Sequence, residues 1–227
     1  MSFISKIRRH SRGKRLETFK SFLNESGLRS LSRPIRIIDL GGTVSFWSKW
    51  WDLSAADQIE VTLINDHTVD TTLANESTDS QFIVNQKKDA NALTEADFEN
   101  FDLVFSNSFF EHLCSVDQQK TLAEKLSRSG KPFFVQIPNK YSPVDPHHPL
   151  APFFATYPEW LRVQLLARLS FGISPRAGSL EAARSWQRCY NPLGRDDLAR
   201  MFPDADIVVE RSLLLPMSLI ASRGARG

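Results

Sequence analysis

The segment that most constrains the fold of this chain is residues 37–43, Ile-Ile-Asp-Leu-Gly-Gly-Thr. It has the pattern of an apolar strand that ends beside an acidic residue and then breaks at two glycines, Gly41 and Gly42. Glycine lets a backbone turn sharply and approach a ligand closely, because it carries no Cβ atom. A strand followed by a glycine-rich turn and a helix forms the nucleotide-binding corner of a doubly wound sheet. The segment therefore predicts a nucleotide-like cofactor at this corner.

Length and composition narrow the class of protein. The 227 residues suffice for one large domain, and the 41% that are hydrophobic supply a sizeable core. The formal net charge is only +2, so the composition indicates no polyelectrolyte partner. No apolar run approaches the roughly 18 residues of a membrane span. The first residues also lack the long apolar core of a secretory signal.

Cysteine is sparse, with Cys114 and Cys189 alone. So few cysteines fit a reducing compartment and a chain without a disulfide framework. Two cysteines this far apart in the sequence also make poor metal-ligand spacing. We therefore expect a cytoplasmic protein.

Residues 1–34 form a basic segment that we expect to be helical, because apolar residues recur in it at roughly helical spacing. One interpretation is a solvated amphipathic helix that covers the edge of the sheet. The other is contact with an anionic membrane surface or with nucleic acid. Nucleic acid is disfavoured, since the segment lacks the interleaved aromatic residues of a base-stacking surface. Within residues 6–20, only Glu17 opposes the basic residues, which are Lys6, Arg8, Arg9, Arg12, Lys14, Arg15 and Lys20.

Strand and helix patterns alternate along the rest of the chain. This alternation predicts an α/β fold, a doubly wound and mostly parallel sheet with helices on both faces. A helix is expected at 116–129, ending before Gly130. The last two strands are joined by the short link 211–217, which suits an antiparallel hairpin. The expected strands are 36–40, 59–64, 82–85, 102–106, 132–137, 207–210 and 218–221.

Residues 35–227 are expected to form a single domain with a helical insert at about 153–190, before the sixth strand. The stretch 160–169 fits a helix with a broad apolar face, and a second helix is expected at 180–188. An insert near the carboxyl ends of the strands can cover a site and select its substrate. The alternative is a plain packing layer.

The glycine turn argues against a dinucleotide cofactor. A dinucleotide site needs the pattern Gly-x-Gly-x-x-Gly, so that the pyrophosphate can meet the start of a helix. Here that pattern would need glycine at Thr43 and a small residue near Phe46, and the next residue is the bulky Trp47. A cofactor without phosphates needs fewer glycines, which favours such a cofactor over NAD or FAD.

Residues 37–45 resemble the first motif of the class I S-adenosylmethionine-dependent methyltransferases, and the resemblance extends along nearly the whole chain. It implies S-adenosyl-L-methionine as cofactor and a seven-stranded Rossmann-like methyltransferase sheet with an antiparallel last strand. In the family, the acidic residue and the glycine turn hold the methionine part of the cofactor. The resemblance carries this role over to Asp39, Gly41, Gly42 and Thr43, although Thr43 and Ser45 stand where the family usually has glycines.

The second and third motifs of the family end the next two strands. An acid at the end of the second strand binds the ribose hydroxyls in the family, and Asn65 stands at the matching position. An amide can accept a hydroxyl proton but gives up a charge-assisted bond. Asp66 takes over the role if the strand runs one residue longer. Asp89 and Ala90 match the position beside the adenine amino group, the alternative for Asp89 being a helix cap.

The fourth motif is matched by residues 101–112. The resemblance places the strand-end backbone of Asn107 and Ser108 beside the cofactor, with Glu111 and His112 just beyond. The alternative for His112 is a satisfied interior histidine.

Residues 136–152 resemble the Pro-Asn-x-Tyr and Glu-Pro-His segment of a methyltransferase type 11-like subgroup, with Asp145 in place of the glutamate. Prolines recur here at every third residue, and polyproline II has three residues per turn. Consecutive histidines therefore face different ways in such a segment. The resemblance favours His147 as a catalytic base, whereas the polar edge shared with Asp145 favours His148. The alternative is a stiff loop whose histidines face solvent.

The resemblance implies transfer of a methyl group to a small-molecule or glycan-type acceptor, with oxygen as the expected acceptor atom. A base matters if that acceptor is a hydroxyl, and imidazole titrates near neutral pH. One alternative is an RNA or protein methyltransferase, which the basic start favours. The other is a non-catalytic module that kept the fold and lost the cofactor. No metal-ligand pattern is visible in the sequence, so no metal is expected.

Overall fold

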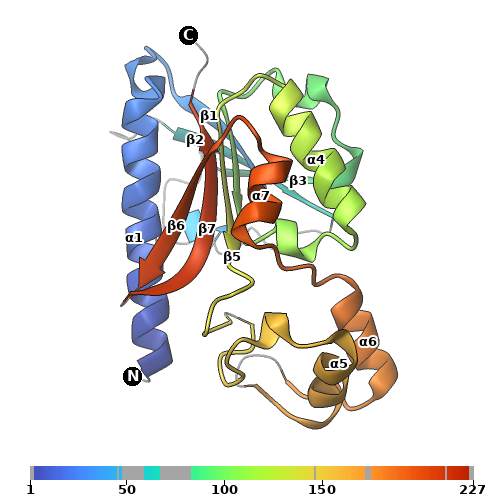
Figure 1. The fold of residues 1–227 in the computed structure, drawn as a ribbon. Helices are drawn as coiled ribbons and strands as arrows, with labels where there is room; N and C mark the ends of the chain where they lie inside the picture. The colour runs from blue at the N-terminus through green and yellow to red at the C-terminus, as the bar shows by residue number, and fades with distance from the viewer. Residues whose placement is uncertain are drawn as a thin grey trace.

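We describe a computed structural model of the chain, which covers residues 3–44, 46–47, 59–66, 83–145, 147–171, 175–212 and 214–224. Within these residues a seven-stranded sheet has the order β3-β2-β1-β4-β5-β7-β6 (Figure 1). Its strands are β1 (Ile35–Leu40), β2 (Ile59–Asn65), β3 (Ile83–Lys87), β4 (Leu103–Asn107), β5 (Phe133–Pro138), β6 (Asp206–Ser212) and β7 (Leu215–Arg223).

The predicted fold class is confirmed. Strands β1 to β5 are paired in parallel, whereas β7 is antiparallel to both of its neighbours, β5 and β6. The hairpin link is shorter than the predicted 211–217, because β6 continues to Ser212 and β7 begins at Leu215. The predicted start of the third strand, Phe82, lies outside the described residues.

Strand β1 is the topological switch point of the sheet. It pairs with β2 on one side and β4 on the other, so that Leu40 lies level with both Ile64 and Ser106. A crevice opens outside the carboxyl ends of the strands at such a point, and ligands bind there. The residues that follow β1, β2 and β4 therefore meet at one edge of the sheet.

Helices cover both faces of the sheet (Figure 1). Helix α1 (Phe3–Glu25) lies on one face, and α4 (Val116–Arg128) and α7 (Arg195–Met201) lie on the other. The ring of Phe19 on α1 is centred 4.7 Å from that of Phe105 and 5.1 Å from that of Phe134. The described part of the basic start is thus a helix with an apolar side, packed on central strands rather than along the edge only.

One basic residue of α1 ties this helix to three strands. The guanidinium of Arg15 donates a 2.7 Å hydrogen bond to Asn107 Oδ1 at the end of β4. It also lies 3.2 Å from Glu210 Oε2 on β6 and donates to Ser218 Oγ on β7. Its charge is therefore neutralised inside the fold, which leaves this residue no role on a membrane surface or a nucleic acid.

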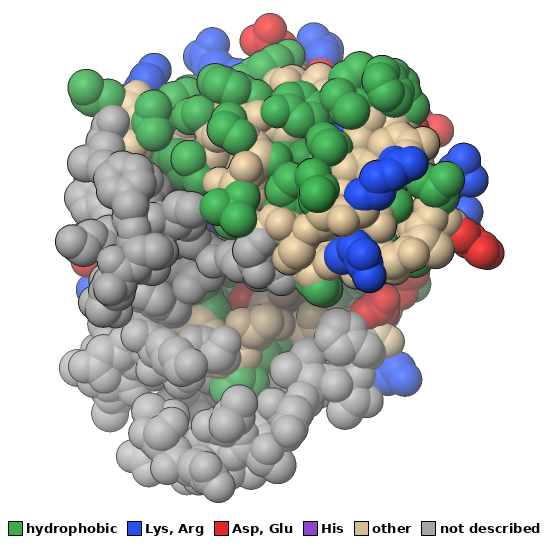
Figure 2. Space-filling view, turned by 90° about the horizontal axis from the view of Figure 1, so that it is seen from below, with side chains coloured by type: hydrophobic (Ala, Val, Ile, Leu, Met, Phe, Trp, Pro, Cys, Tyr) green, Lys and Arg blue, Asp and Glu red, His purple; other side chains and the backbone are tan. Residues whose placement is uncertain are grey.

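The insert between β5 and β6 contains α5 (Glu159–Arg168) and α6 (Leu180–Arg188), which lie below the strand ends in Figure 1. It has a small core of its own, in which Phe154 and Leu166 are almost fully buried. Figure 2 shows hydrophobic side chains gathered over much of the face seen from below. The exposed apolar side chains in and beside the insert include Leu150, Phe153, Trp160, Leu169 and Trp186.

The expectation of a chain without disulfides that a reducing compartment implied is wrong, because Cys114 and Cys189 form a disulfide. The two are 75 residues apart in sequence, and the return of the chain from α6 to the segment after β4 brings them together. The argument for a reducing compartment loses its basis, and a cytoplasmic location stays a prediction. Among the described residues, no helix is both long and apolar enough to cross a membrane.

We predict that Phe19→Ala lowers the free energy of unfolding by about 3–5 kcal/mol, because it leaves a cavity between α1 and the sheet. Urea unfolding measures this change. Glu17→Ala, on the exposed side of the same helix, is the matched control and is expected to change stability by less than about 0.5 kcal/mol. Equal effects of the two changes would show that the packing of Phe19 on the sheet does not contribute to stability.

Candidate functional site

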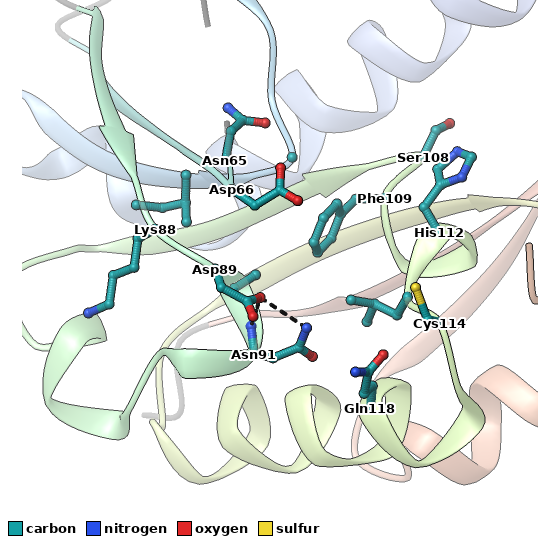
Figure 3. Close-up of a pocket in the computed structure, with 14 residues that line it drawn as sticks. Asn65, Asp66, Lys88, Asp89, Asn91, Ser108, Phe109, His112, Cys114 and Gln118 are labelled. Carbon is teal, nitrogen blue, oxygen red and sulfur yellow. Dashed lines mark hydrogen bonds between the residues drawn. The ribbon is translucent and has the colours of Figure 1, made fainter. Parts of the chain in front are cut away.

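A cavity of about 460 Å³ lies at the switch point of the sheet (Figure 3). This volume falls in the range of about 300–1,000 Å³ that is typical of small-molecule sites. The segments that follow β1, β2, β3 and β4 all contribute to its lining. Six of the residues expected to bind a cofactor line it: Gly41, Asn65, Asp66, Asp89, Ala90 and Ser108.

The glycine turn closes one side of the cavity. Gly41 has a φ of 73°, and a Cβ atom there would lie 2.3 Å from the ring of Phe109. A Cβ atom on Gly42 would lie 1.9 Å from Asp39 Oδ2. Distances this short are hard-sphere clashes, so both positions require glycine. Gly42 itself does not line the cavity, and it acts by letting the turn pack on Asp39.

Asp39 lies beneath this turn rather than in the cavity. It is 1% exposed, and its Oδ2 accepts a 2.7 Å hydrogen bond from the indole nitrogen of Trp47. Burial raises the pKa of Asp39 to about 8, against the lowering effect of the Trp47 bond. Thr43 is exposed and also lies outside the cavity. Trp47, whose bulk argued against a dinucleotide, fills the core below the turn.

Asn65 is the last residue of β2, which runs one residue beyond the predicted Ile64, and Asp66 follows it. Asn65 is buried, and its side-chain amide donates a 3.0 Å hydrogen bond to the carbonyl of Gly42. Asp66 is exposed and lines the cavity (Figure 3). The amide therefore holds the glycine turn, while the carboxylate faces the cavity.

Asp89 faces the cavity and also caps a helix. It lines the cavity, and its Oδ1 accepts hydrogen bonds from the backbone and side-chain nitrogens of Asn91, at 2.9 and 3.0 Å (Figure 3). It thereby caps the short helix η3 (Ala90–Ala92). Asn107, in contrast, lies outside the cavity, because its side-chain oxygen accepts from Arg15.

Sequence reasoning missed part of the lining. Apolar side chains of Ile64, Phe109 and Leu113 contribute to it, as do the polar Asn91 and Gln118. Phe109 comes from the turn after β4, where Ser108 has a φ of 58° and turns the chain back toward Gly41. The match of this segment to the fourth motif was the available signal, since the motif includes the aromatic pair before the Glu-His dipeptide.

A second group of polar side chains adjoins the cavity through His112. The Nε2 atoms of His112 and His147 lie 3.8 and 3.9 Å from Glu111 Oε1, and the centres of the two rings are 4.9 Å apart. Glu111 is fully buried, whereas the two histidine side chains are 44% and 33% exposed. We call Glu111, His112 and His147 the Glu-His-His cluster.

His148 points the other way from the cluster. It is buried, its ring stacks on Phe154 at 3.9 Å, and its Nδ1 lies 3.3 Å from Asp145 Oδ1. Asp145 also accepts from the backbone nitrogens of both histidines and from the hydroxyl of Tyr190. Burial tends to raise the pKa of Asp145, but the bonds from His148 and Tyr190 outweigh it and lower that pKa. This carboxylate therefore anchors the histidine loop to the insert.

Comparison with known proteins places the fold. No protein-family model matches the chain, and no curated protein matches it. Solved structures do match, at low identity. The S-adenosylmethionine-dependent methyltransferase SibL in its apo form is 14% identical, with a TM-score of 0.54 over 86% of this chain and 52% of that one. This chain therefore spans about half the length of SibL.

Two further structures match over more of their length. Magnesium protoporphyrin IX methyltransferase (ChlM) from Synechocystis PCC 6803, with bound S-adenosylhomocysteine, is 11% identical, with a TM-score of 0.54 over 99% of this chain and 89% of that one. A structure described as a possible exported protein from Bordetella parapertussis is 18% identical, with a TM-score of 0.56 over 93% and 68%. The chain thus has the fold of the class I S-adenosylmethionine-dependent methyltransferases.

We predict that the burial of Asp39 makes the stability of the protein fall between about pH 4 and pH 8. A carboxyl group whose pKa is raised by folding favours the folded state below its unfolded pKa, and this contribution is lost as pH rises through the folded pKa. Urea unfolding across this pH range should show a flatter profile for Asp39→Asn, by up to about 1.4 kcal/mol per pH unit. Asp117→Asn, at an exposed position, should keep the wild-type profile. Parallel profiles for all three proteins would contradict the prediction.

Proposed function

We propose that the chain is an S-adenosylmethionine-dependent methyltransferase that acts on a small-molecule acceptor. The observation that carries this proposal is the cavity at the switch point of the sheet. It has carboxylates from two strand ends and apolar side chains, and its glycine turn lacks the further glycines of a pyrophosphate site. The presence of S-adenosylhomocysteine in ChlM, which has this fold, supports the same cofactor here.

The residues of the cavity fit the parts of this cofactor. Asp66 suits the ribose hydroxyls, since a carboxylate accepts two hydroxyl protons in charge-assisted bonds. Asp89 and Ala90 suit the adenine edge, and Ile64 and Phe109 offer apolar surface to its ring. Asn65 supports the site through Gly42 rather than through the ribose. These assignments favour Asp66 over Asn65 for the ribose.

Bound S-adenosylmethionine would supply a methyl group on a sulfonium, which is a good leaving group. What the chain must add is orientation of the acceptor in a place from which water is excluded. His112 lines the cavity and neighbours His147, so we place the acceptor against these two side chains. A histidine there promotes loss of a proton from a hydroxyl acceptor. His148, buried between Asp145 and Phe154, instead holds the loop in place.

A small-molecule or glycan-type acceptor agrees with the contacts of the described residues better than RNA or protein does. ChlM is named for a small-molecule acceptor, which supports the same class here. The basic start favoured RNA, but its Arg15 is paired with Glu210 inside the fold and is therefore not available to phosphates. A non-catalytic module remains the competing hypothesis, and cofactor binding separates the two.

We predict that the purified chain binds S-adenosylmethionine and S-adenosylhomocysteine in calorimetric titrations, and that Asp66→Asn weakens both about tenfold or more. A hydrogen bond to a charged group contributes about 1.5–3 kcal/mol. Asp117→Asn makes the same chemical change outside the cavity and should bind like the wild type. Absence of heat and of a thermal shift with either ligand would support the non-catalytic module.

We predict that His147→Ala lowers kcat about 100-fold or more with an acceptor found by screening methyl transfer to small molecules. Its affinity for S-adenosylhomocysteine should not change, because His147 does not line the cofactor cavity. His148→Ala should instead lower the melting temperature, because it removes the ring packed on Phe154. An unchanged kcat for His147→Ala would remove this residue from the acceptor site, and transfer to RNA alone would overturn the acceptor class.

A further inference from the structure

The Glu-His-His cluster contains a buried charge that the fold leaves unsatisfied. Glu111 is fully buried, and neither of its carboxylate oxygens has a hydrogen-bond partner among the described residues. A buried carboxylate is costly unless it is paired or coordinates a metal. The groups nearest to it are the ring nitrogens of His112 and His147, at distances too long for hydrogen bonds.

We propose that Glu111, His112 and His147 bind one divalent transition-metal ion. Each offers one ligand atom, and the three ligand atoms lie within 4.8 Å of one another. Imidazole and carboxylate ligands suit ions such as Zn²⁺, Mn²⁺, Fe²⁺ and Co²⁺. The group is one that sequence spacing does not reveal, since His147 is 35 residues beyond His112 and follows a different strand.

The distances suit an ion after a small adjustment. Bonds from Zn²⁺ to nitrogen or oxygen measure about 2.0–2.2 Å, so two ligand atoms of one tetrahedral ion are about 3.3–3.6 Å apart. The 3.8 and 3.9 Å distances from Glu111 Oε1 to the two histidines exceed this separation by a few tenths of an ångström. The two imidazole rings are partly exposed, so they can rotate toward an ion.

Neighbouring groups hold the ligands without competing for the ion. The backbone oxygen of Glu111 accepts a 2.7 Å hydrogen bond from Asn191. Asp145, the other buried carboxylate nearby, is engaged by His148 and Tyr190 and orients the backbone of His147. Cys114 is bonded to Cys189 and offers no thiolate. Among the residues that the structure describes, the donor set is therefore limited to one oxygen and two nitrogens.

Three protein ligands leave coordination positions open, as in catalytic rather than structural metal sites. Because His112 also lines the cavity, an open position faces the place assigned to the acceptor. An ion there holds an acceptor oxygen and lowers the pKa of its hydroxyl, so that the proton leaves to solvent. His147 then acts as a ligand of the ion. This role in the reaction rests on the proposed function, whereas binding of the ion does not.

Titration of the untagged, chelator-treated protein with Co²⁺, followed by visible absorption, tests the proposal. We expect one ion per chain, with no thiolate charge-transfer band, and an affinity at least tenfold lower in each of His147→Ala, His112→Ala and Glu111→Gln. His148→Ala is the matched control and should bind Co²⁺ like the wild type. Glu111→Gln should remain folded, because it removes a buried charge and keeps the shape of the side chain.

Two variants separate the metal site from the cofactor site. Asp66→Asn should lose affinity for S-adenosylhomocysteine and keep Co²⁺, whereas His147→Ala should do the reverse. Binding of Co²⁺ without any binding of S-adenosylhomocysteine would overturn the proposed function and leave the metal site standing. Absence of Co²⁺ binding, or binding that His147→Ala leaves unchanged, would overturn the metal site.

Discussion

The geometry of the candidate site depends on the contacts that hold the segment after β4 against the end of the insert. Asn191, just after α6, donates from its backbone to the carbonyl of Glu111 and from its side chain to the carbonyl of Leu113. The disulfide of Cys114 fastens the same segment to the end of α6. Leu113 and Cys114 line the cofactor cavity, and Glu111 belongs to the Glu-His-His cluster. One junction therefore sets both sides of the site, and neither side can shift without the other.

The glycine turn shows how one stretch both excludes and permits ligands. Gly42 packs on Asp39, whose carboxyl group accepts from Trp47 within the core. The bulky Trp47 fills the space below the turn, where a pyrophosphate site needs small residues. The buried carboxyl group is kept without full hydrogen bonding, since its Oδ1 has no partner in the described part of the chain. The incompletely hydrogen-bonded Asp39 lowers local stability, but its position lets the turn bring backbone close to the cavity.

The strands were predictable because they rest on local patterns that tertiary packing did not override. The antiparallel last pair follows from the short link between its strands, whereas the methyltransferase sheet was expected from the family resemblance. What a pattern could not supply is which way a side chain points. Asn65 donates to the glycine turn and Asp66 faces the cavity, because β2 runs one residue further than its apolar pattern indicates. The cysteine pair and the approach of His147 to Glu111 depend on the return of a long insert, which has no local signature.

The contact between Arg15 and Glu210 joins residues 195 apart in sequence, nearly the two ends of the chain. Loop closure over such a distance is entropically costly and has to precede the gain from the contact. During synthesis α1 leaves the ribosome before the strands it packs on, and the partner of Arg15 is made 195 residues after it. The apolar side of α1, with Phe19 at its centre, therefore stays uncovered until β4 and β5 have been made. Apolar surface that waits for distant partners in this way is prone to aggregation before folding is complete.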